Sequence, residues 1–209
     1  MGRLRALPLM ISLLFLAGCA GRGGGTGEEL AQSIQAEYSQ FTAVTCRVDL
    51  RAEYDERVFD CTLDVAWDNA TGATLTIVEP ELAKGVTARI ANGEASLQYG
   101  DFSLETGPLT WEGLSPMETV PALWGQITGG YIAGTSLTEG LLEVTYRPGD
   151  DPPGTGLEAV VTFDTESGKP TVGELFWDGS RVVTVEVQAF EMMGATEHGT
   201  DTNEDVGGD

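Results

Sequence analysis

The feature that most constrains the fold is a pair of alternating segments between residues 44 and 67. In the first segment, apolar side chains occupy every second position from Val44 to Ala52, and polar or charged side chains occupy the positions between them. The second segment repeats this pattern, with its apolar positions at Phe59, Cys61, Leu63, Val65 and Trp67. A period of two is typical of a β-strand with one buried and one exposed face. The sequence therefore predicts two long antiparallel strands.

Further short segments predict a large antiparallel sheet that curls towards a barrel. The expected strands are 74–79, 85–91, 94–99 and 102–105, then 141–147, 157–163, 171–177 and 181–190. Asn92-Gly93 and Asp178-Gly179 predict tight hairpin turns, because both central positions of such turns need positive φ. The fold class expected is mainly β with few helices.

Two helices are expected beside this sheet. The first follows a capping-box pattern at Thr26, with apolar residues spaced by three or four positions up to Phe41. The second covers residues 115–127, with Ser115 as its cap, Pro116 at its first position and a kink or restart at Pro121. The glycines at 129, 130 and 134 predict a loop after it.

The N-terminal segment has the features of an export signal. Arg3 and Arg5 precede an apolar run from Ala6 to Gly18, which is shorter than the ~18 residues needed to span a bilayer. The run ends in Leu16-Ala17-Gly18-Cys19, which resembles the bacterial lipobox. We expect residues 1–18 to be a lipoprotein signal peptide and residues 19–27 to be a lipidated Cys19 with a glycine-rich tether. The alternative is an ordinary signal peptide with a chance cysteine.

Charge and residue content exclude several classes of function. The net charge of -22 disfavours binding to nucleic acids and to anionic lipid surfaces. The single histidine, His198, lies in the acidic segment 194–209, which we expect to be disordered. A nucleophile activated by histidine and a zinc site are therefore not expected, and neither is any cofactor. Asp49, Asp60 and Asp64 occupy polar positions of the alternating strands and are expected to form a solvated face.

Cys46 and Cys61 share the apolar face of the two predicted strands. An exported domain can keep a disulfide, and direct opposition of the two cysteines requires paired positions that sum to 107. That register places Val48 opposite Phe59 and the turn at Glu53-Tyr54. A sum of 111 would place the cysteines too far apart for a bond. The disulfide is the expectation, and two buried free thiols are the alternative.

Three short phrases support a resemblance to a known superfamily. They are Leu97-Gln-Tyr-Gly-Asp-Phe-Ser-Leu104, Gly113-Leu-Ser-Pro116 and Val185-Glu-Val-Gln-Ala-Phe190. Together with the order of helices and strands, they resemble the LolA/LolB-type lipoprotein-sorting superfamily, especially its membrane-anchored members in spore-forming bacteria, the GerS-like germination lipoproteins. The resemblance covers residues 28–193. It implies an incomplete β-barrel, or half-barrel, closed by an N-terminal helix and a lid helix over a hydrophobic cavity.

The resemblance also implies two functions. The first is a membrane-anchored extracytoplasmic lipoprotein that binds or sorts the acyl chains of lipids or lipoproteins. The second is a non-catalytic partner of a cell-wall amidase of the spore cortex. The residues expected to line the cavity are Val48, Leu50, Phe59, Leu63, Leu123 and Trp124. On residue pattern alone, the tryptophans Trp67, Trp111, Trp124 and Trp177 favour a filled core over a cavity.

Overall fold

A computed structural model describes residues 25–54, 57–108, 116–149 and 152–194 of the chain. The helices are α1 (Gly25–Tyr38) and α2 (Thr119–Gly129). The strands are β1 (Phe41–Tyr54), β2 (Arg57–Asp68), β3 (Gly72–Glu79), β4 (Thr87–Ala91), β5 (Glu94–Tyr99), β6 (Phe102–Pro108), β7 (Tyr131–Thr138), β8 (Leu141–Arg147), β9 (Leu157–Asp164), β10 (Pro170–Trp177) and β11 (Ser180–Gly194). The predicted signal peptide, Cys19 and residues 195–209 of the predicted acidic tail lie outside the described residues, whereas Gly194 ends β11.

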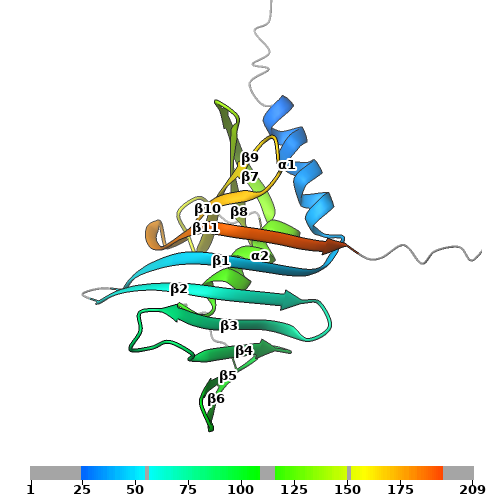
Figure 1. The fold of residues 1–209 in the computed structure, drawn as a ribbon. Helices are drawn as coiled ribbons and strands as arrows, with labels where there is room; N and C mark the ends of the chain where they lie inside the picture. Colours follow the sequence, from blue (N-terminus) through cyan, green and yellow to red (C-terminus); the bar gives the residue numbers. More distant parts are fainter. Residues whose placement is uncertain (1–24, 55–56, 109–115, 150–151, 195–209) are drawn as a thin grey trace, which may run out of the picture.

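The described strands form one 11-stranded antiparallel sheet in the order β6-β5-β4-β3-β2-β1-β11-β10-β9-β8-β7. The chain builds one half from β1 outwards to β6 and the other from β7 inwards to β11, so β1 and β11 join the halves. Figure 1 shows the strong twist that carries the strands from β1–β3 to the upright β7–β9, with α1 beside that end of the sheet. The edge strands β6 and β7 do not pair with each other. The predicted mainly β half-barrel is confirmed.

Both predicted tight turns are confirmed. Asn92 and Gly93 have φ values of 54° and 77°, and Asp178 and Gly179 have values of 47° and 76°. A third turn of this kind joins β7 to β8 at Glu139 and Gly140, with φ values of 51° and 82°. The sequence pattern missed it because glutamate is rarely selected for a left-handed position.

Two predicted boundaries are wrong at the helices. Phe41 begins β1 instead of ending α1, and α1 begins at Gly25, so it includes the last residues of the predicted tether. Helix α2 begins at Thr119 with Glu118 as its N-cap, and Glu118 makes no side-chain capping bond. Pro121 therefore lies in the first turn of α2, where a missing N–H costs nothing, and it neither kinks nor restarts the helix. Ser115 lies outside the described residues.

The predicted loop after α2 is also wrong, because residues 131–138 form strand β7. Gly134 lies at a register shift between Ile132 and Gly134 in the β7–β8 pair. A glycine inside a strand often marks such an irregularity. Here Gly134 led to the prediction of a loop in place of a strand. This strand completes the second half of the sheet.

The predicted register of β1 and β2 is wrong, and so is the disulfide that depended on it. The observed pairs sum to 111: Cys46 lies opposite Val65, and Cys61 lies opposite Leu50. Four residues of β2 separate Cys61 from Val65, or roughly 13 Å at the rise of an extended strand. Both cysteines are free thiols. The pairing extends to Tyr54 and Arg57, so the turn falls two residues later than predicted.

Candidate functional site

Helix α2 crosses the inner face of the curled sheet and presents a broad apolar surface to it. Leu123, Trp124 and Ile127 are all buried, with exposed fractions of 8 % or less. Spacings of one and four residues place these side chains on one side of a helix. The helix packs against α1 and against strands β8, β9 and β10. Helix α2 therefore lies over the sheet, where the sequence predicted the helix that closes the half-barrel.

A small apolar cavity lies between α2 and the inner face of the sheet. Its volume is about 50 Å³. Its lining consists of Val44, Cys46, Val48, Val65, Trp67, Ala73, Val120, Pro121, Leu123, Trp124, Ile127, Val161, Pro170, Gly173, Val185, Val187 and Phe190. None of these side chains carries a charge, a hydroxyl or an amide. A space with such walls stays dry and accepts hydrocarbon.

Leu123 occupies part of the space between lid and sheet. A Cβ atom at Gly173 of β10 would lie only 2.8 Å from Cδ1 of Leu123. The missing side chain at Gly173 therefore creates the notch in which the end of Leu123 rests. This notch explains why a glycine stands at an interior position of β10, where it is otherwise unfavourable.

An aromatic cluster closes the cavity on the side of α1. The ring of Trp124 lies 5.4 Å from Trp67, 5.5 Å from Tyr38 and 6.3 Å from Phe190, measured between ring centroids. The rings are tilted by 41° to 47° relative to Trp124, which avoids face-to-face contact. These contacts join α2 to α1, β2 and β11.

The C-terminal end of α2 is held by α1. The side-chain Nε2 of Gln35 donates a 2.9 Å hydrogen bond to the backbone carbonyl of Gly130, directly after α2. The hydroxyl of Tyr38 donates a 2.8 Å bond to the carbonyl of Gly168 in the β9–β10 turn. These two hydrogen bonds connect α1 to the end of α2 and to the β9–β10 turn. The position of α1 therefore affects the position of α2, which lines the cavity.

The structure brings together three of the six residues expected to line the cavity. Val48, Leu123 and Trp124 are part of the lining, whereas Leu50 and Leu63 are buried in the core outside it. The side chain of Phe59 is 43 % exposed, near the end of the β1–β2 hairpin. Sequence reasoning did not assign the residues that β9–β11 contribute, which are Val161, Pro170, Gly173, Val185, Val187 and Phe190. The alternation of residues 181–190 predicts a strand with one buried face. No local feature of the sequence shows that this strand pairs with β1.

The only ionisable side chain in the lining is Cys46. Burial raises the pKa of its thiol to about 12, and the nearby Asp64 carboxylate adds to the effect. Burial likewise raises the pKa of Cys61 to about 11, with Asp60 and Asp49 contributing. Both cysteines are therefore neutral thiols at physiological pH, and neither is an activated nucleophile.

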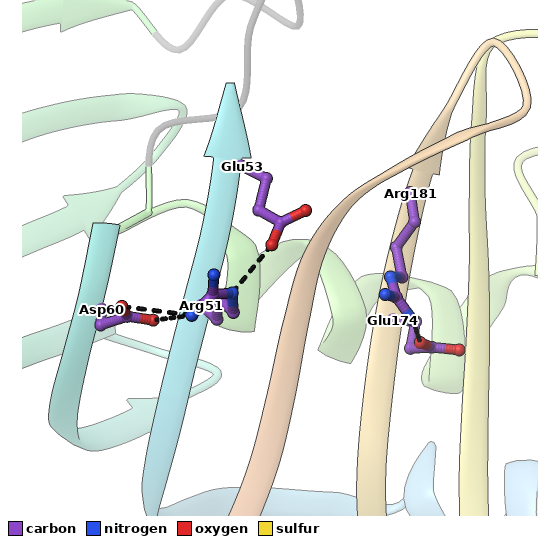
Figure 2. Close-up of polar contacts among 5 residues, drawn as sticks. All are labelled: Arg51, Glu53, Asp60, Glu174 and Arg181. Atoms are coloured by element: carbon purple, nitrogen blue, oxygen red, sulfur yellow. Dashed lines mark hydrogen bonds and ion pairs between the residues drawn. The ribbon is translucent and has the colours of Figure 1, made fainter. Parts of the chain in front are cut away.

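The outer face of the sheet is charged and exposed to solvent, as the sequence predicted, and its charged side chains form ion pairs. The guanidinium of Arg51 lies 2.8 Å from Glu53 and 3.2 Å from Asp60, and Arg181 lies 2.7 Å from Glu174. Figure 2 shows these side chains on adjacent strands, with a helix passing behind the sheet. These ion pairs are largely exposed to solvent. Each of their carboxylates is paired with an arginine, so they do not form a pair of free carboxylates.

The remaining predicted carboxylates of the outer face are also bonded to neighbours. Arg47 donates two 2.7 Å hydrogen bonds to Asp64, and these hold the pKa of Asp64 below its usual value. Asp49 accepts bonds from Thr62 and from Gln188. Among the described residues, no group of His, Cys, Asp and Glu side chains could hold a metal ion. In the same part of the chain, no helix is long and apolar enough to cross a membrane.

Comparison with known proteins gives matches among solved structures only. No protein-family model and no curated protein matches the sequence. A LolA superfamily protein, NE2245 from Nitrosomonas europaea, matches with 12% identity and a TM-score of 0.44, over 79% of this chain and 94% of that chain. Lipoprotein LppX from Mycobacterium tuberculosis matches with 15% identity and a TM-score of 0.42, over 78% and 95%.

A structure of the CwlD amidase from Clostridioides difficile in complex with the GerS lipoprotein also matches. The identity is 15% and the TM-score 0.39, over 78% of this chain and 94% of that chain. A LolA superfamily protein and GerS are thus among the solved structures that match, each with a TM-score below 0.5.

Proposed function

We propose that this domain binds the acyl chain of a lipid or lipoprotein between α2 and the inner face of the sheet. The observation that carries the proposal is the cavity, whose lining is entirely uncharged although the whole chain has a net charge of -22. In a strongly acidic protein, a surface without charged side chains indicates that apolar material covers that surface. Hydrocarbon fits this surface, and charged metabolites do not.

The cavity requires α2 to move when a chain enters. Its volume of about 50 Å³ is well below the roughly 150 Å³ of an engineered cavity that admits benzene. In the closed state described here, Leu123 rests in the notch over Gly173 and takes the place of a ligand. Displacement of α2 from the sheet would expose the lining, and each methylene buried there would contribute roughly 0.8 kcal/mol.

The proposal places the domain at the outer surface of a cell membrane. Its basis is the segment ending in Leu16-Ala17-Gly18-Cys19, with the thiol of Cys19 as the site of lipid attachment. A short tether would then keep α1 and the cavity close to the membrane, which is a source of acyl chains. The protein would act as an anchored acceptor of lipid.

The proposal is tested by titration with a fluorescent fatty-acid probe. The protein is the mature chain, residues 19–209, made without its signal sequence and therefore unlipidated. Saturable binding of one probe per chain is expected, and Trp124→Ala should change the affinity more than it changes the circular dichroism spectrum. Trp177→Ala is the matched control, because Trp177 does not line the cavity.

Absence of saturable binding by the folded chain would reject the acyl-binding function. The alternative prediction, a non-catalytic partner of a cell-wall amidase, would then be the one to pursue by co-purification. The two outcomes are distinct, because a pure partner protein needs no lipid to be fully active.

A further inference from the structure

The indole N–H of Trp124 is buried without a hydrogen-bond acceptor. Trp124 is 8 % exposed, and its Nε1 has no partner among the described residues. Buried N–H groups almost always find a partner, and one left without it costs free energy. This polar group therefore stands out in a site whose other walls are apolar.

The neighbours of Trp124 explain why no acceptor is available. The rings of Tyr38, Trp67 and Phe190 surround it at centroid distances of 5.4 to 6.3 Å. The only side-chain oxygen among these three residues is the hydroxyl of Tyr38, which donates to the carbonyl of Gly168 and is not bonded to Trp124. An N–H bond to a π face is weak compared with a bond to a carbonyl oxygen. No side chain of the cavity lining bears a carbonyl, carboxylate or hydroxyl oxygen. The indole N–H therefore has no acceptor in the closed site, and a ligand with a carbonyl oxygen could supply one.

We infer that Trp124 selects acyl ligands, which carry a carbonyl oxygen, over plain hydrocarbon chains. The indole N–H would donate to the ester, amide or acid carbonyl while the chain lies along the apolar lining. The inference rests on the proposed acyl-binding function and deepens it, because it assigns the polar end of the ligand to the aromatic cluster. A tryptophan serves this purpose well, since its ring is apolar and its single donor is fixed in direction.

The test compares two ligands of similar chain length in three proteins. Methyl palmitate and heptadecane, both delivered from cyclodextrin, compete with the fluorescent fatty-acid probe on residues 19–209. Their ratio of affinities is measured for the wild type, for Trp124→Phe and for the matched control Trp177→Phe. Differences in ligand solubility cancel when the ratios are compared. We expect Trp124→Phe to lower the preference for the ester about 10-fold, and Trp177→Phe to leave it unchanged.

A second measurement covers the case in which Trp124→Phe fails to fold. In ¹⁵N-labelled wild-type protein, the indole proton of Trp124 should move downfield with methyl palmitate and stay in place with heptadecane. An equal ester preference in wild type and Trp124→Phe, or equal shifts with both ligands, would overturn the inference while leaving acyl binding intact. If neither ligand displaces the probe and the probe itself does not bind, the proposed function fails first.

Discussion

Replacement of Leu123 by alanine separates a lid from an ordinary core helix. Leu123 is 6 % exposed and rests in the notch over Gly173, next to the cavity. Truncation removes three carbon atoms from the space that a ligand is proposed to use. The variant should therefore lose stability and gain affinity for an acyl chain, whereas truncation of a core residue away from the cavity should only lose stability.

The size of both effects follows from the packing. Leucine-to-alanine changes in cores cost about 2 to 5 kcal/mol and cost least where the surroundings can relax. Because Leu123 already borders a cavity of about 50 Å³, we expect a loss of about 2 kcal/mol in the free energy of unfolding. A ligand that fills the vacated space gains about 2 kcal/mol, or roughly 30-fold in affinity, at about 0.8 kcal/mol per carbon.

The assay combines urea unfolding with probe titration. Leu142→Ala is the matched control, because Leu142 is fully buried in β8 and does not line the cavity. Both variants should unfold at lower urea than the wild type. Saturating fatty acid should restore more stability to Leu123→Ala than to Leu142→Ala, since the stabilisation by a ligand rises with the logarithm of its affinity.

One result would refute this reasoning. If Leu123→Ala loses as much stability as Leu142→Ala, binds the probe no more tightly and gains nothing extra from fatty acid, then Leu123 is a core residue and α2 is no lid. Weaker probe binding by Leu123→Ala would contradict the account even more strongly.

Three further predictions concern stability and processing. Gly72→Ala should cost about 3 kcal/mol in urea unfolding, because Gly72 has φ +86° and a Cβ would lie 2.1 Å from the carbonyl oxygen of Ile90; wild-type stability would refute the strain. Cys46 and Cys61 should release their protons on unfolding above about pH 9, so the free energy of unfolding should fall between about pH 9 and pH 12 and change little from pH 7 to pH 8. Replacing both cysteines by alanine should reduce that fall. Cys19→Ala should abolish labelling by a palmitate analogue, and persistent labelling would reject the lipobox.

Much of the fold could be predicted because its signals are local. The alternation of apolar and polar residues shows which side chains of β1 and β2 lie on the buried face and which lie on the exposed face. The charged outer face with Asp60 and Asp64 was therefore predicted correctly. Paired residues with positive φ marked two hairpin turns. These features depend on neighbours in the chain and need no knowledge of tertiary contacts.

The register and the cavity depend on distant parts of the chain. The alternation of β1 and β2 fits sums of 107 and 111 equally well, because a shift of two positions per strand keeps every side chain on its face. The assumption of a disulfide led to the sum of 107, whereas the observed sum is 111. Six of the seventeen lining residues come from β9–β11, more than a hundred residues after β1. The β1–β11 pairing that joins the two halves of the sheet has no local signal in the sequence.

Native mass spectrometry of the mature chain purified from bacterial membranes tests the central claim most directly. The account predicts one bound molecule per chain, released on unfolding and identified as a species with an acyl chain. Val48→Phe, which fills part of the cavity, should lose this molecule and keep the fold. A wild-type chain that is free of lipid, or a lipid retained equally by Val48→Phe, would contradict an acyl site between α2 and the sheet.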